Sequence, residues 1–247
     1  MSTTPQTAAA LRRPTLSPLA LNAVVATWLM ALYNATFWGH LFRIFDGRIV
    51  TALIFSAAVW ALMLLVLSLL AVRRAQKPVL ALLIVIAAIT SFYMDTLGVV
   101  IDREMIQNAV TTTVAESKHL ITPQFLTHVG LYGVLPAAVV LWVQVRRRTV
   151  WRALGVWALV TAGSAALVVG LLFTNLKGYS TVLRADKELM GAVQPLAPMS
   201  GALRYAKMML KSTQIVLQPT GTDAKPGPFL AGADKPVLMV IVAGETA

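Results

Sequence analysis

The sequence predicts an all-α membrane protein whose chain crosses the bilayer five times. Of its 247 residues, 57% are apolar and only 13% are charged, whereas a soluble domain carries about 25% charged residues. The apolar residues form long, nearly charge-free runs, and the basic residues gather in alternate segments between those runs. This composition excludes a soluble globular enzyme as a description of the whole chain, and the high apolar content excludes a disordered protein.

Five apolar runs are long enough to cross a membrane as helices. A helix rises 1.5 Å per residue, so about twenty residues span the ~30 Å hydrocarbon core of a bilayer. The first run contains asparagines but no charged residue, and it is too long for the core of a cleaved signal peptide. We therefore expect it to be retained. The five runs are Pro18–Trp38, Ile49–Val72, Pro78–Val100, Phe125–Val145 and Trp151–Phe173.

Basic residues in the connecting segments predict the orientation of these helices. Nine Lys and Arg residues and no acidic residue lie before the first run, between the second and third, and between the fourth and fifth. The two alternate loops hold four basic residues together with four acidic ones. By the positive-inside rule, the amino terminus is cytoplasmic and the segment after residue 173 lies outside. The nine are Arg12, Arg13, Arg73, Arg74, Lys77, Arg146, Arg147, Arg148 and Arg152.

The net charge of +11 is explained mostly by this topology and by contacts with lipid headgroups. The sequence lacks the interleaved aromatic and basic residues that single-strand binders use, so we expect membrane lipids and no nucleic acid as partners. The chain has no cysteine. This excludes thiolate metal sites, cysteine nucleophiles and disulfides within these residues.

The outer loop from Ile101 to Pro123 predicts a short helix with one polar face. Asp102–Glu104 has the acids of a helix amino-terminal turn. Asn108, Thr112 and Glu116 follow at a spacing of four, which places an amide, a hydroxyl and a carboxylate along one face. Such a row suits a zwitterionic headgroup, because the carboxylate pairs with an ammonium while the amide and hydroxyl bind phosphate or ester oxygens. An ordinary amphipathic loop helix with a solvated polar side fits the same spacing.

Asp95 is the acidic residue that lies inside an apolar run. An intramembrane carboxylate is a functional candidate, so Asp95 is the residue on which a small transporter would depend. It lies near the outer end of its run, with Ser91 and Tyr93 close by. A wetted, hydrogen-bonded residue at the edge of the membrane is the alternative interpretation.

Residues 174–235 predict helices at the membrane interface followed by a linker. Ser200–Thr213 is typical of an amphipathic helix, in which Arg204, Lys207 and Lys211 form a basic stripe beside apolar faces. A basic stripe on a short apolar helix beside a membrane indicates that the helix lies on the interface, where lipid phosphates favour it. Gln218–Pro228, rich in Pro, Gly and Thr, is predicted to be the linker.

Residues 236–247 predict the first strand of a further domain. Val237–Ala243 is a run of seven apolar residues between Pro and Gly, too short to span a membrane and typical of a strand buried on both faces. Glu245 follows this strand, where α/β sheets place ligand and metal groups. Its carboxylate is therefore a candidate cation ligand, and Thr246 offers a hydroxyl.

In combination these features resemble the amino-terminal part of the lipid A phosphoethanolamine transferases, the family that includes the transferable colistin-resistance enzymes. The loop VVIDREMIQNAVTTTVAES is similar to the family's Met-Ile-x-Asn followed by Thr and Glu. GTDA at Gly221–Ala224 is similar to the linker before the catalytic domain, and VLMVIVAGETA resembles its opening strand and Gly-Glu-Thr-Ala signature. The chain departs from the family at Thr112-Thr113, where Thr-Asp is common, and at residues 184–187, where Arg-Ala-Asp-Lys replaces Arg-Asn-His-Lys.

The resemblance implies an enzyme of the inner membrane of Gram-negative bacteria, with an alkaline-phosphatase-like periplasmic α/β domain that holds zinc. Such enzymes move phosphoethanolamine from phosphatidylethanolamine to lipid A through a phosphorylated threonine. Glu245 matches a zinc ligand, and Asn108, Thr112 and Glu116 match residues implicated in holding the donor headgroup. The family's nucleophilic threonine and other zinc ligands lie beyond Ala247.

We therefore expect three parts in the chain. Residues 1–173 form the five-helix transmembrane domain, residues 174–235 the periplasmic interfacial helices and linker, and residues 236–247 the first strand of a truncated catalytic domain, so that this chain alone is inactive. A related phosphoglycerol-type transferase is the alternative enzyme, and it would not need Glu116 because its headgroup has no amine. A non-catalytic five-span module or a transporter built around Asp95 is the alternative of a different class.

Overall fold

The computed structural model describes residues 13–70, 73–113, 118–146, 149–186 and 188–212, with the isolated residues 223, 225, 227 and 240. The chain divides into two units, Met1–Met208 and Met209–Ala247. The predicted linker and the predicted strand at residues 236–247 fall almost entirely outside the described residues, and so do Glu116, Glu245 and Thr246.

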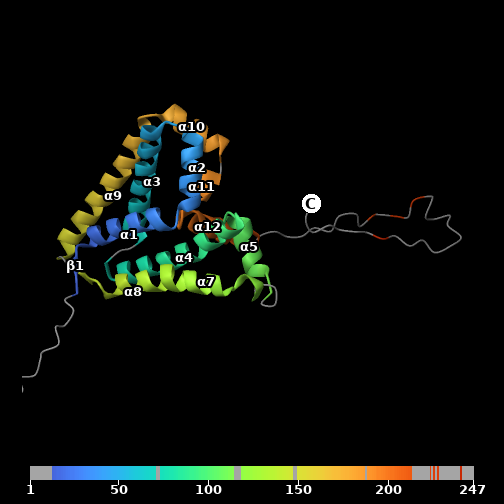
Figure 1. Ribbon diagram of the computed structural model, residues 1–247, viewed down its shortest axis with the longest axis horizontal. Coiled ribbons are helices and arrows are strands. Elements are labelled where there is room, and N and C mark those ends of the chain that lie inside the picture. Colours follow the sequence, from blue (N-terminus) through green and yellow to red (C-terminus); the bar gives the residue numbers. More distant parts are fainter. Residues whose placement is uncertain are drawn as a thin grey trace, which may run out of the picture. The chain divides into compact units, whose positions relative to one another are not determined.

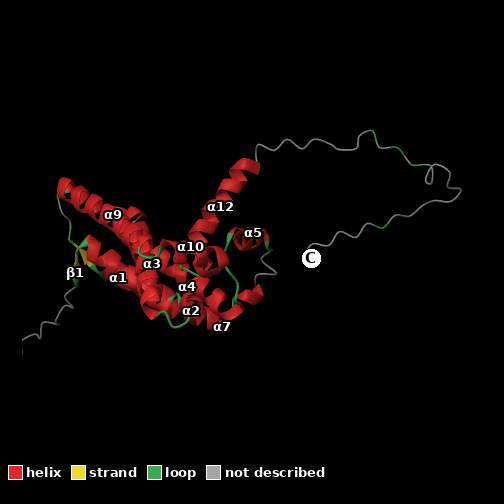
Figure 2. Cartoon of the chain, turned by 90° about the horizontal axis from the view of Figure 1, so that it is seen from above, coloured by secondary structure: helices red, strands yellow, loops and turns green. Residues whose placement is uncertain are grey.

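Helices account for most of the described chain (Figures 1 and 2). The longer ones are joined by short turns, which include the 3-10 turns η1 (Arg73–Ala75) and η2 (Lys118–Leu120) and the π-helical turn η3 (Val129–Val134). The helices are α1 (Pro18–Leu32), α2 (Ala35–Phe45), α3 (Ile49–Leu70), α4 (Gln76–Leu97), α5 (Arg103–Thr111), α7 (Pro123–His128), α8 (Leu135–Trp142), α9 (Val150–Phe173), α10 (Leu176–Ala185), α11 (Glu188–Gly191) and α12 (Leu196–Ser212).

Four helical segments are long and apolar enough to cross a membrane. They are α3, α4, α9 and the segment Pro123–Trp142, which joins α7, η3 and α8. They confirm the second to fifth predicted runs as helices of spanning length. The first predicted run is corrected, because α1 ends at Leu32 and the chain bends by 71° into α2. The bent pair is a fifth crossing if it is counted as one span.

The bend between α1 and α2 is made by a polar side chain. Asn34 Nδ2 donates hydrogen bonds to the carbonyl oxygens of Leu29, at 2.8 Å, and Gln194, at 3.1 Å. Its Oδ1 accepts the backbone N–H of Gln194 at 2.7 Å. Neither Pro nor Gly lies between Leu32 and Ala35, so the kink arises from a side chain that replaces the missing helical bonds. Because Gln194 is 160 residues away, apolar periodicity alone predicts a straight helix here.

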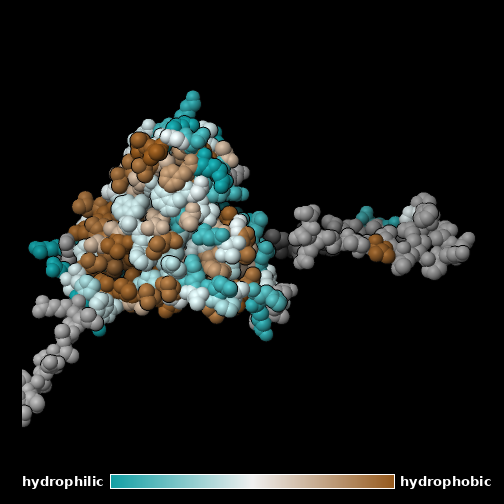
Figure 3. Space-filling model, viewed as in Figure 1, coloured by the Kyte–Doolittle hydropathy of each residue, from teal (hydrophilic) through white to brown (hydrophobic). Residues whose placement is uncertain are grey.

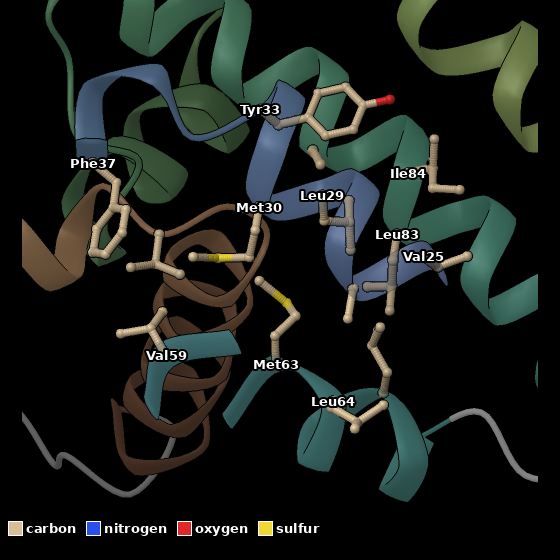
Figure 4. Packing of buried hydrophobic residues seen from close by; sticks show 14 of the residues in the cluster. Val25, Leu29, Met30, Tyr33, Phe37, Val59, Met63, Leu64, Leu83 and Ile84 are labelled. Atoms are coloured by element: carbon tan, nitrogen blue, oxygen red, sulfur yellow. The ribbon is translucent and has the colours of Figure 1, made fainter. Parts of the chain in front are cut away.

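The apolar core lies where α1, α3 and α4 meet, as Figure 4 shows. Side chains from α1 pack against side chains from α3 and α4, and within a bilayer such close van der Waals contacts stabilise a helix bundle. By contrast, α9 packs against α3 but buries only Ser164 of its own described residues. In Figure 3, apolar residues also gather on the part of the surface where Figure 1 places α9. An apolar helix that stays exposed on most sides is expected to face lipid. The labelled core residues include Val25, Leu29, Met30, Val59, Met63, Leu64, Leu83 and Ile84.

The basic segments predicted to share one side of the membrane meet at one end of the bundle, here called the ribbon end (residues 13–17, 73–76 and 143–146). The strands β1 (Thr15–Leu16) and β2 (Gln144–Val145) pair in parallel there. Gln76 Nε2 donates to the carbonyl oxygen of Pro18 at 2.7 Å, which brings in the segment between α3 and α4. Figure 1 shows α5 at the other end of α4 from β1. The acid-free basic segments and the mixed loop that carries α5 therefore lie at opposite ends of α4.

Candidate functional site

The predicted polar face lies on α5, which begins where the sequence indicates. Asp102 is the N-cap residue, and its Oδ1 accepts the backbone N–H groups of Glu104, at 3.0 Å, and Met105, at 2.9 Å. These bonds satisfy amide donors that an uncapped helix leaves unpaired. Asp102 thereby fixes the start of α5 at Arg103, with five residues between it and the end of α4 at Leu97.

Asn108 and Thr112 lie together at the carboxyl end of α5, and both are exposed. Thr112 Oγ1 donates to the carbonyl oxygen of Asn108 at 2.6 Å, and its backbone N–H donates to the same oxygen at 2.8 Å. The helix ends at Thr111, and Thr112 is already extended, with φ −66° and ψ 135°. The predicted continuation of one helix face through Thr112 to Glu116 is therefore wrong at Thr112. The reason is the run of threonines 111–113, whose β-branched side chains weaken the last turn.

A close helix contact holds α5 in place. A Cβ atom on Gly201 of α12 would lie 2.9 Å from the backbone carbon of Asp102 and 3.0 Å from Cδ1 of Ile106. Likewise, a Cβ atom on Gly191 would lie 2.9 Å from Cγ1 of Val100. Both glycines thus allow the chain before and within α5 to rest directly on α11 and α12. Sequence periodicity does not reveal this contact, because a glycine has no side chain to pattern.

Buried hydrogen bonds fix the segment between α11 and α12 to the membrane helices. Gln194 is 0% exposed. Its Oε1 accepts from Thr90 Oγ1 of α4 at 2.6 Å, and its backbone groups bond to Asn34 as described above. Buried polar groups with satisfied partners specify one arrangement, because every alternative leaves a desolvated donor or acceptor. A continuous chain of contacts therefore runs from the bend at Asn34 through Gln194 and α12 to α5.

The basic stripe predicted for residues 200–213 is present on α12. This helix starts earlier than predicted, at Leu196, and ends at Ser212. Arg204, Lys207 and Lys211 are exposed, and Arg204 Nη2 donates to Ser200 Oγ at 3.4 Å. Since Gly201 contacts Asp102 and Ile106 of the α5 segment, Arg204 follows that contact by about one turn of α12.

Asp95 lies at the edge of its helix and not inside the bundle. It is exposed, in the last turn of α4, and its Oδ1 accepts a hydrogen bond from Thr36 Oγ1 at 2.6 Å. This matches the interpretation of a wetted, hydrogen-bonded edge residue. The bond ties the first turn of α2 to the last turn of α4.

One polar cluster was not predicted from the sequence. The ligand atoms of His40, Asp186 and Glu188 lie within 4.8 Å of one another, and His40 Nδ1 is 3.3 Å from Asp186 Oδ2. Burial raises the pKa of the Asp186 carboxyl, but hydrogen bonds from His40 and from the backbone amides of Leu189 and Glu188 outweigh it, so this pKa lies below its usual value. An imidazole and two carboxylates are a donor set that a divalent cation accepts. His40 and Asp186 are 146 positions apart in the sequence, so no local motif indicates this cluster.

The family model for "Phosphoethanolamine transferase EptA/EptB" matches residues 59–210. The matched region includes α5, η3, α8, α9 and the packed segment through most of α12. The chain belongs to this phosphoethanolamine transferase family.

Two proteins of Escherichia coli illustrate how the chain relates to this EptA/EptB family. It is 32% identical over 240 residues to the phosphatidylethanolamine transferase Mcr-1, with 95% of this chain and 44% of Mcr-1 aligned. It is 28% identical over 247 residues to the phosphoethanolamine transferase EptA of strain K12, with 96% of this chain and 44% of that protein aligned. The chain thus spans less than half the length of these relatives.

A solved structure shows the same fold. The integral membrane lipooligosaccharide phosphoethanolamine transferase A (EptA) of Neisseria meningitidis superposes with a TM-score of 0.76 at 21% sequence identity, covering 85% of this chain and 41% of that chain. The helical arrangement is therefore that of an integral membrane member of the EptA/EptB family, as the resemblance predicted.

Proposed function

We propose that this chain is the membrane portion of a phosphoethanolamine transferase that takes its group from phosphatidylethanolamine and adds it to lipid A. Membership of the EptA/EptB family carries the proposal, and the printed name of Mcr-1 supports phosphatidylethanolamine as the donor. The part played by this chain is to hold the donor headgroup at the membrane surface, at the site formed by Asn108 and Thr112.

We further propose that the protein lies in the bacterial inner membrane with its amino terminus in the cytoplasm. The ribbon end gathers the basic segments that carry no acidic residue, and such segments stay on the cytoplasmic side. The end that carries α5 and α12 then faces the periplasm. Both lipids would reach α5 from the outer leaflet of that membrane.

At the end of α5, different polar residues would contact the ammonium and the phosphate of the headgroup. The Thr112 hydroxyl donates its hydrogen bond to the backbone carbonyl oxygen of Asn108, so the hydroxyl oxygen can accept a hydrogen bond from an ammonium. The side-chain amide of Asn108 carries N–H donors for phosphate oxygens. Glu116, which lies outside the described residues, would supply the carboxylate that pairs with the ammonium. The exposed Arg204 and Lys207 of α12 would add attraction for lipid phosphates.

The metal chemistry belongs to residues that the structure does not describe. Glu245 remains a predicted zinc ligand, taken from its place after the predicted strand and from the family signature. Zinc, when bound, neutralises charge on a transferring phosphoryl group and lowers the pKa of a bound hydroxyl. A phosphorylated threonine in the complete protein would divide the transfer into two steps between two lipids.

Mass spectrometry of lipid A tests this function. The complete protein would be produced in a Gram-negative host that lacks its own phosphoethanolamine transferases. We expect lipid A to gain phosphoethanolamine with the wild-type protein and to remain unmodified with Glu245→Ala at equal abundance in the membrane. Unmodified lipid A with an abundant, membrane-inserted wild-type protein would contradict the proposed acceptor.

The same host distinguishes the proposed enzyme from a phosphoglycerol-type transferase and from a transporter. Glu116→Gln should abolish transfer from a donor with an amine, whereas a phosphoglycerol-type transferase should tolerate it. Asp95→Asn should leave lipid A modification largely intact, because Asp95 is a hydrogen-bonded edge residue. Loss of an ion or solute flux on Asp95→Asn in proteoliposomes, with no lipid product from the wild type, would instead favour the transporter.

A further inference from the structure

A second polar site lies at the ribbon end, at the opposite end of the bundle from α5. A cavity of about 650 Å³ opens between the start of α1, the end of α3, the start of α4, β2 and the first turns of α9. Ligand pockets in proteins commonly measure about 300–1,000 Å³. The size is thus ample for a phosphorylated headgroup together with the first part of its acyl chains.

The inner part of this cavity is lined by buried polar residues that bond to one another. Gln76 Nε2 donates to Asn22 Oδ1 at 2.8 Å, and Asn22 Nδ2 donates to Ser68 Oγ at 3.4 Å. All three residues line the cavity, and each is at most 5% exposed. Trp157 Nε1 donates to the Ser68 carbonyl oxygen at 2.8 Å and so joins α9 to the same network. Polar groups held this firmly form a preorganised surface for a polar ligand.

Three cations surround this polar lining. Arg74 comes from η1, Lys77 from the first turn of α4, and Arg146 from the residue after β2. None of the described residues that line the cavity is acidic. The ion pairs found among the described residues are His40–Asp186 and Arg103–Glu104, so neither involves these cations. The charge of the cavity is therefore complementary to an anion.

The remaining wall is apolar and belongs to α9. Its members are Val150, Ala153, Leu154, Val156, Trp157 and Val160. Leu154 is 52% exposed and Trp157 is 37% exposed, so this wall continues onto the surface that faces lipid. A soluble phosphate ester has no apolar part to contact such a wall, whereas a lipid's acyl chain can pack along it while staying in an apolar environment.

We propose that this cavity binds an anionic glycerophospholipid from the leaflet at the ribbon end. Its phosphate contacts Arg74, Lys77 and Arg146, its glycerol and ester oxygens face Asn22, Gln76 and Ser68, and its acyl chains lie along α9. Basic pockets between transmembrane helices recognise anionic headgroups in this way. The site differs from the proposed donor site in position, and no described lining residue offers a carboxylate for an ammonium, so it favours an anionic lipid over a zwitterionic one.

Native mass spectrometry of the complete protein in detergent tests the proposal. Phosphatidylglycerol and phosphatidylethanolamine would be added at equal concentrations, with glycerol phosphate as the probe that lacks acyl chains. We expect phosphatidylglycerol to remain bound at least about tenfold better than either of the others. Arg74→Gln/Lys77→Gln/Arg146→Gln should remove that preference. Arg43→Gln/Arg48→Gln/Lys177→Gln, the same charge change at exposed positions away from the ribbon end, should keep it.

A second variant separates lipid binding from charge and from folding. Ala153→Trp should fill the cavity from α9 and lower phosphatidylglycerol binding about tenfold without changing any charge. The thermal unfolding of this variant without added lipid should match that of the wild type. The proposal is overturned if the charge-removal variant binds phosphatidylglycerol as the wild type does, if phosphatidylethanolamine binds equally well, or if glycerol phosphate competes at the same concentration as the lipid.

Discussion

Two buried, uncharged polar residues, Asn34 and Gln194, join the bend between α1 and α2 to the segment before α12. Asn34 satisfies the Leu29 carbonyl at the end of α1 and both backbone groups of Gln194. Without it, the α1–α2 bend loses its side-chain hydrogen bonds, and the segment before α12 keeps the bond from Thr90 to Gln194 but loses both of its bonds to Asn34. Both residues are buried, so water does not replace the missing partners.

Asn34→Leu should therefore destabilise the protein by about 1–3 kcal/mol, because at nearly constant volume it removes the side-chain partner of the buried Gln194 N–H and carbonyl oxygen and leaves the Leu29 carbonyl with only the Tyr33 N–H. Thermal or denaturant unfolding in detergent, followed by tryptophan fluorescence, measures this change. Asn108→Leu makes the same chemical change at an exposed position and should alter stability by less than about 0.5 kcal/mol. Equal stability of the two variants would show that the buried bonds contribute nothing net.

Asp186 should make the stability of the α10–α11 region depend on pH. Its pKa lies below the usual value of 3.8, so the ionised carboxylate is the form that the fold stabilises. That contribution is present above pH about 4 and is lost as the pH falls through the lower, folded-state value. Asp186→Asn keeps the cap of α11 but removes the charge beside His40.

We expect Asp186→Asn to lower stability by about 1 kcal/mol at pH 7 and the difference from the wild type to shrink as the pH falls below about 4. Unfolding curves of both proteins between pH 7 and pH 3 check the prediction. Asp46→Asn, the same change at an exposed carboxylate outside this cluster, is the control. A difference that grows as the pH falls would give the linkage the opposite sign.

At the scale of elements, glycine positions decide which helices touch. Gly201 brings α12 against the start of α5, and Gly133 in η3 would place a Cβ atom 3.2 Å from Cβ of Ala88 in α4. In contrast, nothing lies within 4 Å of a Cβ atom added at Gly163 of α9. The two helical glycines Gly201 and Gly163 therefore provide a matched pair for testing the support of α5.

Gly201→Leu should displace α5 from α12 and lower transferase activity at least about tenfold, since a small misplacement of a binding group is costly in rate. The bundle should remain folded, with tryptophan fluorescence and detergent behaviour like those of the wild type. Gly163→Leu should leave activity unchanged. If Gly201→Leu kept full activity, the position of α5 on α12 would not matter for the donor site.

The elements that the sequence predicts are those determined by local chemistry. Apolar length predicts α3, α4 and α9, and the acidic turn at Asp102 predicts the start of α5. Elements that depend on distant partners are not predicted: the bend at Asn34, the pairing of β1 with β2, and the cluster at His40. For the candidate site, spacing correctly identified Asn108 and Thr112 as neighbours, but it did not foresee that the helix ends between them.

At the scale of the whole molecule, cysteine labelling can test which end of the bundle faces the periplasm, because the chain has no cysteine of its own. A single cysteine can be introduced at Glu104 on α5 or at Thr149 before α9, both exposed. In spheroplasts, a membrane-impermeant maleimide should label Glu104→Cys at once and label Thr149→Cys only after permeabilisation. The reverse pattern would place α5 in the cytoplasm and contradict the proposed access to lipid A.

The proposed function depends on α5 as the place where the donor headgroup binds. The most direct measurement is the rate of phosphoethanolamine transfer by the complete protein as phosphatidylethanolamine is varied in mixed micelles. Asn108→Ala and Thr112→Val should raise the donor KM about tenfold or more, because each removes a hydrogen bond to a charged group. Gln107→Ala and Thr111→Val change neighbouring exposed residues of the same helix, and Thr111 Oγ1 likewise bonds to a backbone carbonyl. These controls should keep the wild-type KM, whereas an unchanged KM in Asn108→Ala and Thr112→Val would contradict the account.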